Sequence, residues 1–280
     1  MKPNDRFVGL PNSFWACVRI VGQEAGYTKR GQFQVSAPSI RELASALTAT
    51  GLNPGHLVEA DGRPTVLGSK LLDYFNFRAD ALNTLVEPRL MNKTSAKKAF
   101  EAERRKLRPT CPLPLNKQKG DKRTYAFLTG LVNMIVDANR AGVPCDFDPR
   151  RLITVSRNGI PLRTLSRRVD GAFPSVVDPV AIWEVKEYYH TTTFGSRVAD
   201  GVYETLLDGM ELAELREHEG VHVLHYLIVD DHYTWCECGR SYLCRILDAL
   251  HMGYVDEVLF GREVLERLPQ IVREWVRISQ

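Results

Sequence analysis

The feature that most constrains the fold is a charged pair in the middle of an apolar segment. Residues 180–189 read VAIWEVKEYY, with the β-branched and aromatic composition of a buried strand. Glu184 and Lys186 stand two positions apart, so on a strand both side chains point to the same face as Ile182 and Tyr188. Burying two charges costs several kcal/mol each unless they are paired or bind a ligand. The fold must therefore supply these side chains with partners.

Composition places the chain among soluble globular proteins. Its 280 residues are 44% hydrophobic and 25% charged, which suits one large domain or two ordinary ones. No apolar run is long enough to cross a bilayer, and the first residues, MKPNDRFVGL, lack the apolar region of a secretory signal. Six cysteines without regular spacing indicate reduced thiols. We therefore expect a cytoplasmic protein with no membrane partner.

Basic residues are concentrated in one segment. Between residues 93 and 123, eleven Lys or Arg stand against three acids, a net charge of +8, whereas the whole chain carries +3. Phosphates favour concentrated cations because binding releases counterions, so we expect this segment to bind DNA. A solvated linker helix explains the composition equally well. The residues expected to contact DNA here are Lys97, Lys98, Arg104, Arg105, Lys119, Lys122 and Arg123.

The first 108 residues are expected to form a mainly helical domain. Ser39 and Glu42 form the pattern of a capping box, and Gly51 ends the helix that they begin. A further helix is expected over about 69–86, and the turn-rich segment before it contains ADGRPTV, which fits a β-wing. A winged-helix or helix-turn-helix module suits this pattern, and so does any other small helical bundle. Residues 109–122, with three prolines and no periodicity, are expected to be a linker.

The remainder, residues 123–280, alternates helices and strands. After a first helix, two strands are expected around Asn158-Gly159, the strongest short hairpin signal, with the second strand ending at Asp170. The segment VAIWEVKEYY, a helix over about 196–217 and an almost wholly apolar strand, VHVLHYLIVDD, follow in that order. The α-β-β-β-α-β order predicts an α/β fold with a mixed sheet flanked by helices.

Two carboxylates and an ammonium group are expected to converge on the third of these strands. If the second and third strands are neighbours, Asp170 lies opposite Glu184, and two carboxylates repel unless a cation lies between them. Mg²⁺ suits them because it prefers oxygen ligands and keeps several waters for a substrate phosphate. Lys186, one pleat along, can stabilise charge on a phosphate or help to deprotonate water. This set meets the needs of phosphodiester hydrolysis.

Asp170, followed by Glu184-Val185-Lys186 on the next strand, resembles the signature of the PD-(D/E)xK nuclease superfamily. The predicted α-β-β-β-α-β order resembles the core of that superfamily over residues 123–230. The resemblance implies a restriction-endonuclease-like fold in which Asp170 and Glu184 bind Mg²⁺, Val185 lends a backbone carbonyl and Lys186 is the catalytic lysine. The organisation is similar to that of type II restriction endonucleases, which implies double-stranded DNA as the substrate. It also implies a homodimer, because each catalytic centre attacks one strand.

Two other acids compete for a place in this site. Asp178 precedes a proline, but only five residues separate it from Glu184, too few for a turn and a return strand, so Asp170 is preferred. Asp137, near the end of the helix before the hairpin, is the acid that this helix offers as an additional ligand.

Two further candidate binding sites each allow two interpretations. Arg197, at the start of the helix after VAIWEVKEYY, is either a phosphate contact or part of an ordinary helix start. A short segment, DHYTWCECGRSYLC, offers zinc donors, although buried reduced cysteines explain it as well. These donors are His232, Cys236, Cys238 and Cys244.

The sequence therefore predicts a Mg²⁺-dependent endonuclease that hydrolyses DNA, in a type II-like restriction or defence role. Two alternatives stay open. One is a non-catalytic DNA-binding regulator with an inert nuclease-like domain, and the other is a repair, recombination or RNA nuclease on the same core. The sequence has no glycine-rich loop of the P-loop or Rossmann type, so we expect no nucleotide cofactor.

Overall fold

The computed structural model describes residues 1–29, 33–117, 123–190 and 195–280, and its centre is a four-stranded mixed sheet. The strands lie in the order β3-β4-β5-β6; β3 is antiparallel to β4, and β4, β5 and β6 are parallel. Their bounds are β3 (Gly171–Phe173), β4 (Ala181–Glu187), β5 (Leu224–Asp230) and β6 (Glu257–Phe260). The expected mixed sheet is confirmed.

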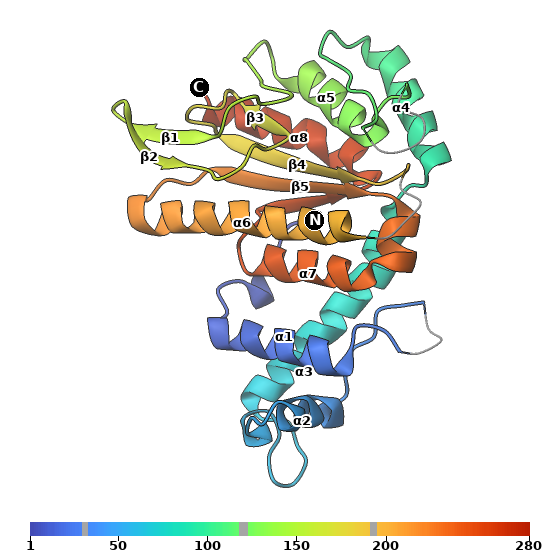
Figure 1. Ribbon diagram of the computed structural model, residues 1–280, viewed down its shortest axis with the longest axis vertical. Coiled ribbons are helices and arrows are strands. Elements are labelled where there is room, and N and C mark those ends of the chain that lie inside the picture. Colours follow the sequence, from blue (N-terminus) through green and yellow to red (C-terminus); the bar gives the residue numbers. More distant parts are fainter. Residues whose placement is uncertain (30–32, 118–122, 191–194) are drawn as a thin grey trace.

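Helices cover both faces of this sheet (Figure 1). On one face lie α5 (Phe127–Asn139) and α8 (Glu263–Ile278), and on the other α6 (Ser196–Glu219) and α7 (Arg240–His251). Along β4, Trp183 and Val185 pack with α5 and α8, whereas Glu184 and Lys186 point towards α6. The shared face that the alternation predicted for these two charges is confirmed. None of the helices in the described residues is long and apolar enough to cross a membrane.

The Asn158-Gly159 hairpin forms, but it stands apart from the main sheet. Strands β1 (Thr154–Arg157) and β2 (Ile160–Thr164) pair in a sheet of their own, and both turn residues have positive φ, as a type I′ turn requires. The prediction that the second hairpin strand ends at Asp170 is wrong. The strand ends at Thr164, Ser166 then bonds to Glu211 on α6, and the separate strand β3 starts after Asp170. An isolated bridge on the other edge of β3 pairs Asp146 with Ala172.

The N-terminal part is helical, as expected. Its elements are η1 (Asp5–Phe7), α1 (Asn12–Ala25), α2 (Ile40–Ala49), η2 (Pro54–His56) and α3 (Val66–Asp80). The capping box of Ser39 and Glu42 starts α2, as the sequence predicted. Around ADGRPTV no strand forms, and the expected β-wing is reduced to a turn closed by an isolated antiparallel bridge between Val58 and Pro64.

Helix α3 connects the N-terminal helices to the sheet (Figure 1). It continues into a π-helical turn, η3 (Ala81–Val86), and a short 3₁₀ turn, η4 (Glu87–Arg89). Near its end, the buried Arg78 donates to both carboxylate oxygens of Asp248 on α7, at 3.0 and 3.2 Å, and the Tyr74 hydroxyl donates to the same carboxylate. This buried pair ties α3 to α7.

The basic helix packs with the sheet-bearing part of the chain. Helix α4 (Lys93–Leu107) buries Ala96 and Phe100 in the same cluster as α5 and α8. Gly130 of α5 makes room for this contact, since a Cβ there would lie 2.5 Å from the Phe100 ring. The sequence analysis grouped α4 with the first 108 residues, whereas the structure packs it against α5 and α8. The predicted domain boundary over 109–122 stays a prediction. The remaining helical element is η5 (Tyr233–Cys238), a π-helical turn before α7.

We expect Arg78→Met to lower the free energy of unfolding by about 3–5 kcal/mol, because it leaves the Asp248 carboxylate without its cation in a low-dielectric region. Guanidinium denaturation measures this loss. Arg6→Met is the control: it breaks an ion pair with Asp73 whose side chains are 55% and 40% exposed, so it should cost no more than about 1 kcal/mol. Equal losses in the two variants would contradict a stabilising role for the buried pair.

Candidate active site

The pairing of β3 with β4 brings Asp170 beside Glu184. Gly171 pairs with Trp183, so the next position of the antiparallel register sets Asp170 opposite Glu184 on the face turned to α6. The Asp170 N–H donates to the Trp183 carbonyl at 3.2 Å, and the Val185 N–H donates to Asp170 Oδ2 at 2.8 Å. The two carboxylates that the sequence predicted as neighbours are therefore neighbours.

Two glycines make room for this arrangement. A Cβ at Gly171 would lie 2.0 Å from the indole of Trp183, which stacks on Trp275 at 5.4 Å between ring centroids. A Cβ at Gly201 on α6 would lie 3.2 Å from Lys186 Cδ and closer still to the Tyr188 hydroxyl. The absence of side chains at both positions lets the indole cover β3 and lets the lysine stem lie against α6.

Two cations hold the Glu184 carboxylate, which is 1% exposed. Arg167 Nη1 donates to Glu184 Oε1 at 2.9 Å, and Lys186 Nζ donates to Glu184 Oε2 at 2.7 Å. Burial raises the pKa of Glu184, but the charges of Lys186 and Arg167 outweigh burial and hold its pKa below its usual range. Glu184 is therefore ionised at neutral pH.

The neighbouring groups titrate differently. Burial of its carboxylate and the negative charge of Glu184 raise the pKa of Asp170 to about 7, although the residue as a whole is exposed to solvent. Burial lowers the pKa of Lys186, but the charges of Glu184 and Asp170 outweigh it and raise the pKa of the ammonium above its usual range. At neutral pH the site thus combines a fixed carboxylate, a fixed ammonium and one carboxyl group close to its midpoint.

The carboxylate cluster consists of Asp170, Glu184, Glu204 and Asp208 with the cations Arg167 and Lys186. The sequence did not predict three of its members: Arg167, Glu204 and Asp208. Arg167 also pairs with Glu204 at 3.2 Å and with Asp208, and Lys186 Nζ donates to Glu204 at 3.0 Å. Burial raises the pKa of Asp208 to about 7. Glu204 and Asp208 stand four residues apart on one face of α6, a spacing that would have indicated them. Glu204 is 43% and Arg167 21% exposed, so these two form the open rim of the site.

The donor atoms suit a hard divalent cation. Asp170 and Glu184 offer carboxylate oxygens, and the Val185 carbonyl lies on the same strand edge as the Val185 N–H, which faces Asp170. Both oxygens of Glu184 already accept from cations, so a metal ion would have to displace Arg167. In the described part of the chain, these two acids do not gather with a third Asp, Glu, His or Cys within 4.8 Å. The chemistry of these residues suits Mg²⁺, but Arg167 is bonded to one of the Glu184 oxygens that the ion would need.

The competing acids lie elsewhere. Asp137, on α5, accepts from Thr110 N–H at 3.1 Å and pairs with Arg140, on the other side of the sheet from Glu184. Asp178 accepts from the backbone N–H and hydroxyl of Ser156 at the hairpin. Both acids therefore have structural partners of their own.

The predicted DNA contacts are mostly exposed. Lys97, Lys98, Arg104 and Arg105 lie on the solvent side of α4; Arg123 and Arg197 are also exposed. Lys119 and Lys122 lie outside the described residues. Since α4 packs on α5, the cations of α4 and the carboxylate cluster lie on opposite sides of the sheet, whereas Arg197 stands on α6, the helix that carries Glu204 and Asp208.

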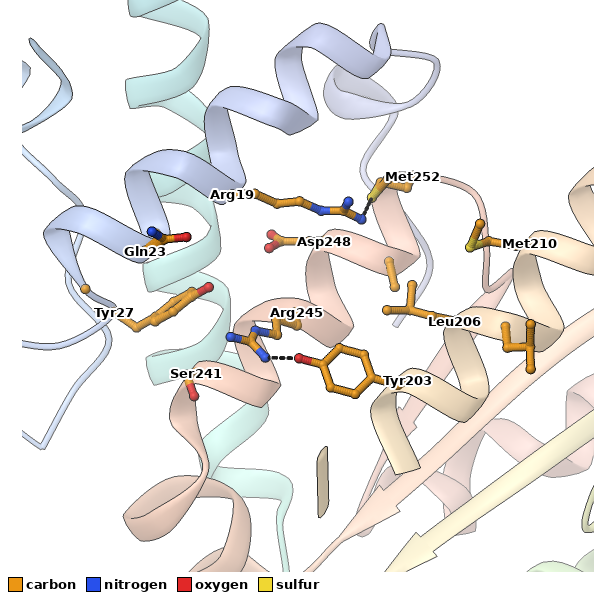
Figure 2. Close-up of a pocket in the computed structure, with 14 residues that line it drawn as sticks. Arg19, Gln23, Tyr27, Tyr203, Leu206, Met210, Ser241, Arg245, Asp248 and Met252 are labelled. Atoms are coloured by element: carbon orange, nitrogen blue, oxygen red, sulfur yellow. Dashed lines mark hydrogen bonds between the residues drawn. The ribbon is translucent and has the colours of Figure 1, made fainter. Parts of the chain in front are cut away.

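A separate cavity of about 810 Å³ lies between α1, α6 and α7 (Figure 2). Arg19 and Arg245 reach it from opposite walls, where Arg245 donates to the Tyr203 hydroxyl and Arg19 contacts the Met252 sulfur at 3.8 Å. Within the described residues, neither arginine forms an ion pair with a carboxylate. The size and lining are those of a small-molecule pocket. Helix α6 separates this cavity from the carboxylate cluster, because Tyr203 faces the one and Glu204 the other.

Comparison with known proteins gives two family matches. Residues 91–275 match the family described as "Domain of unknown function (DUF7687)", and residues 1–85 match the one described as "Domain of unknown function (DUF7690)". No curated protein and no solved structure matches the chain. The two matches meet at residues 86–90, between η3 and α4.

We expect the stability of the protein to depend on Asp170 and on pH. The raised pKa means that the folded state binds a proton more tightly than the unfolded state, whose aspartate titrates near about 3.9. The stabilisation is complete below that pH, declines as the pH rises, and is lost above about 7. Asp170→Asn removes the titrating group, so it should match the wild type near about pH 4 and exceed its stability near about pH 8, by no more than about 1 kcal/mol because Asp170 is exposed and water screens its charge.

Urea denaturation across this pH range, in the presence of EDTA, measures the difference. Asp200→Asn, at an exposed acid on α6, is the control and should show no pH-dependent gain. A constant difference between Asp170→Asn and the wild type at all pH values would contradict a raised pKa.

Proposed function

The chain belongs to the family described as "Domain of unknown function (DUF7687)", and we propose that it is a Mg²⁺-dependent nuclease that hydrolyses phosphodiester bonds of double-stranded DNA. The observation that supports this most is the placement of Asp170, Glu184 and Lys186 on one face of adjacent strands. The order of elements adds support for a restriction-endonuclease-like core. From β3 onward, the elements β3, β4, α6 and β5 keep the β-β-α-β part of the predicted order, whereas the separate hairpin β1-β2 stands between α5 and β3.

Each residue has a role that follows from its surroundings. Bound Mg²⁺ would supply a Lewis acid and an activated water, and Asp170, Glu184 and the Val185 carbonyl would hold it. Lys186 acts as a cation that donates to a phosphate oxygen, and not as a base, because its neighbours raise its pKa. Arg167 holds Glu184 in place and would have to release Oε1 for Glu184 to hold a metal ion.

The exposed cations of α4 supply contacts to phosphates that do not depend on the base sequence. We assign cleavage of both strands to a homodimer, because one centre attacks one strand. A type II-like restriction or defence role is consistent with a duplex substrate.

A second candidate is a DNA-binding regulator with an inert site. This alternative is favoured by the surroundings of Glu184, because both of its carboxylate oxygens are paired with cations and its side chain is 1% exposed. In this alternative the Arg167–Glu184–Lys186 pairing is a permanent structural feature.

We expect Lys186→Met to reduce the Mg²⁺-dependent cleavage of plasmid DNA at least ~100-fold, because the transition state loses its nearby cation. Lys70→Met, in the N-terminal helix α3, is the control and should leave cleavage unchanged. EDTA should abolish cleavage by the wild-type protein. If the wild type and Lys186→Met bind duplex DNA but both leave it intact across many sequences, the regulator alternative holds, and cleavage of RNA alone would change the substrate.

The basic helix can be tested through the salt dependence of DNA binding. Replacing both Arg104 and Arg105 by Gln should make the slope of log K against log salt less steep by up to about 1.8, since each phosphate contact contributes roughly 0.9. The pair Lys97 and Lys98 should behave alike. Arg150→Gln with Arg151→Gln is the matched control for two exposed adjacent arginines. An unchanged slope in both α4 variants would make α4 a solvated helix without phosphate contacts.

A further inference from the structure

A group of metal-ligating side chains lies at the carboxyl end of β5, away from the carboxylate cluster. Ligand atoms of Glu87, His232 and Cys236 all lie within 4.8 Å of one another. His232 Nε2 and Glu87 Oε1 are 3.5 Å apart. Nitrogen and oxygen ligands at the usual zinc distances of about 2.0–2.1 Å lie about 3.4 Å apart in a tetrahedral site. The pair is therefore already spaced as two ligands of one ion.

The backbone holds these ligands in place from two distant parts of the chain. Glu87 directly follows the π-helical turn η3, and His232 directly precedes the π-helical turn η5, which carries Cys236. The His232 N–H donates to the Met91 carbonyl at 2.9 Å, and the Met91 N–H donates to the Asp230 carboxylate at 2.6 Å. π-Helical turns are rare and often occur at functional sites.

The surroundings supply the partners that metal ligands usually have. Arg240 donates to both oxygens of Glu87, at 3.2 and 3.4 Å, and Glu237 Oε1 lies 3.8 Å from His232 Nδ1. Metal-bound histidines usually donate their second N–H to a carboxylate, a role that Glu237 is near enough to take by a small side-chain shift, and bound carboxylates are themselves hydrogen-bonded. Cys236 is fully buried at the base of the group, where a thiolate needs a compensating cation.

We propose that Glu87, His232 and Cys236 form a zinc site that joins the segment between the two family matches to the end of β5. One carboxylate, one imidazole and one thiolate suit zinc and leave a fourth position for water. The sulfur and nitrogen donors disfavour Mg²⁺, so this site is distinct from the Asp170–Glu184 pair. Of the three cysteines in the DHYTWCECGRSYLC segment, only Cys236 takes part, and its partner Glu87 is remote in sequence.

The test uses the full-length protein, stripped of metal with EDTA and titrated with Co²⁺, which reports a thiolate ligand by a charge-transfer band in the near ultraviolet. We expect one equivalent of Co²⁺ to produce the band and zinc to displace it. Cys236→Ser should abolish the band and reduce zinc affinity by more than the ~10–100-fold typical of losing an outer partner. Cys238→Ser, two residues along, is the matched control and should keep the band.

Two further measurements complete the test. Glu87→Gln and His232→Asn, at partly exposed positions, should each weaken zinc binding and remove the rise in Tm that zinc gives the wild type. Asp170→Asn should leave zinc binding unchanged, which separates this proposal from the nuclease proposal. Absence of the band in the wild type, or a band that survives Cys236→Ser, would overturn the zinc site and leave an Arg240–Glu87–His232 ion-pair network.

Discussion

The structure depends on how a carboxylate is accommodated in the central sheet. Glu184 stands on β4, between the antiparallel strand β3 and the parallel strand β5 and beneath α6. A charged group without partners in this position would cost several kcal/mol. Arg167 and Lys186 each bond one of its oxygens, and Glu204 and Asp208 of α6 bond the cations in turn. Helix α6 therefore lies on the sheet through a charge network as well as through apolar packing, and glycine at 201 leaves room for the lysine stem.

The same network sets the chemistry that the site can perform. Glu184 and Lys186 keep their charges at neutral pH because each lies against the other, whereas Asp170, which lacks a cation of its own, has a pKa of about 7. A carboxyl group that binds a metal ion must be ionised, so Asp170 would have to give up its proton to serve as a ligand. The catalytic and the inert interpretations therefore differ in one contact, the hydrogen bond between Arg167 and Glu184, which would have to open in the first and stays in place in the second.

The two candidate metal sites differ in donor chemistry and in place. Oxygen donors on β3 and β4 suit Mg²⁺, and a mixed carboxylate, imidazole and thiolate set at the end of β5 suits zinc. Glu87 lies between the two segments that match separate families, and Arg78 ties α3 to α7 nearby in the chain. The N-terminal helices are thus fixed to the sheet by buried charge, and zinc would add a second attachment.

The local features of the fold follow from the sequence alone. The Ser39–Glu42 cap, the Asn158-Gly159 turn and the alternation along β4 depend on residues a few positions apart, so they could be predicted from spacing. The opposition of Asp170 and Glu184 was also predicted, although the strand that brings it about is a separate one. Only the tertiary structure decided that Arg167, Glu204 and Asp208 surround them, that α4 packs on α5, and that Glu87 meets Cys236. Such partners come together through long chain returns, so even the four-residue spacing of Glu204 and Asp208 shows that they share a helix face but not which strand that face meets.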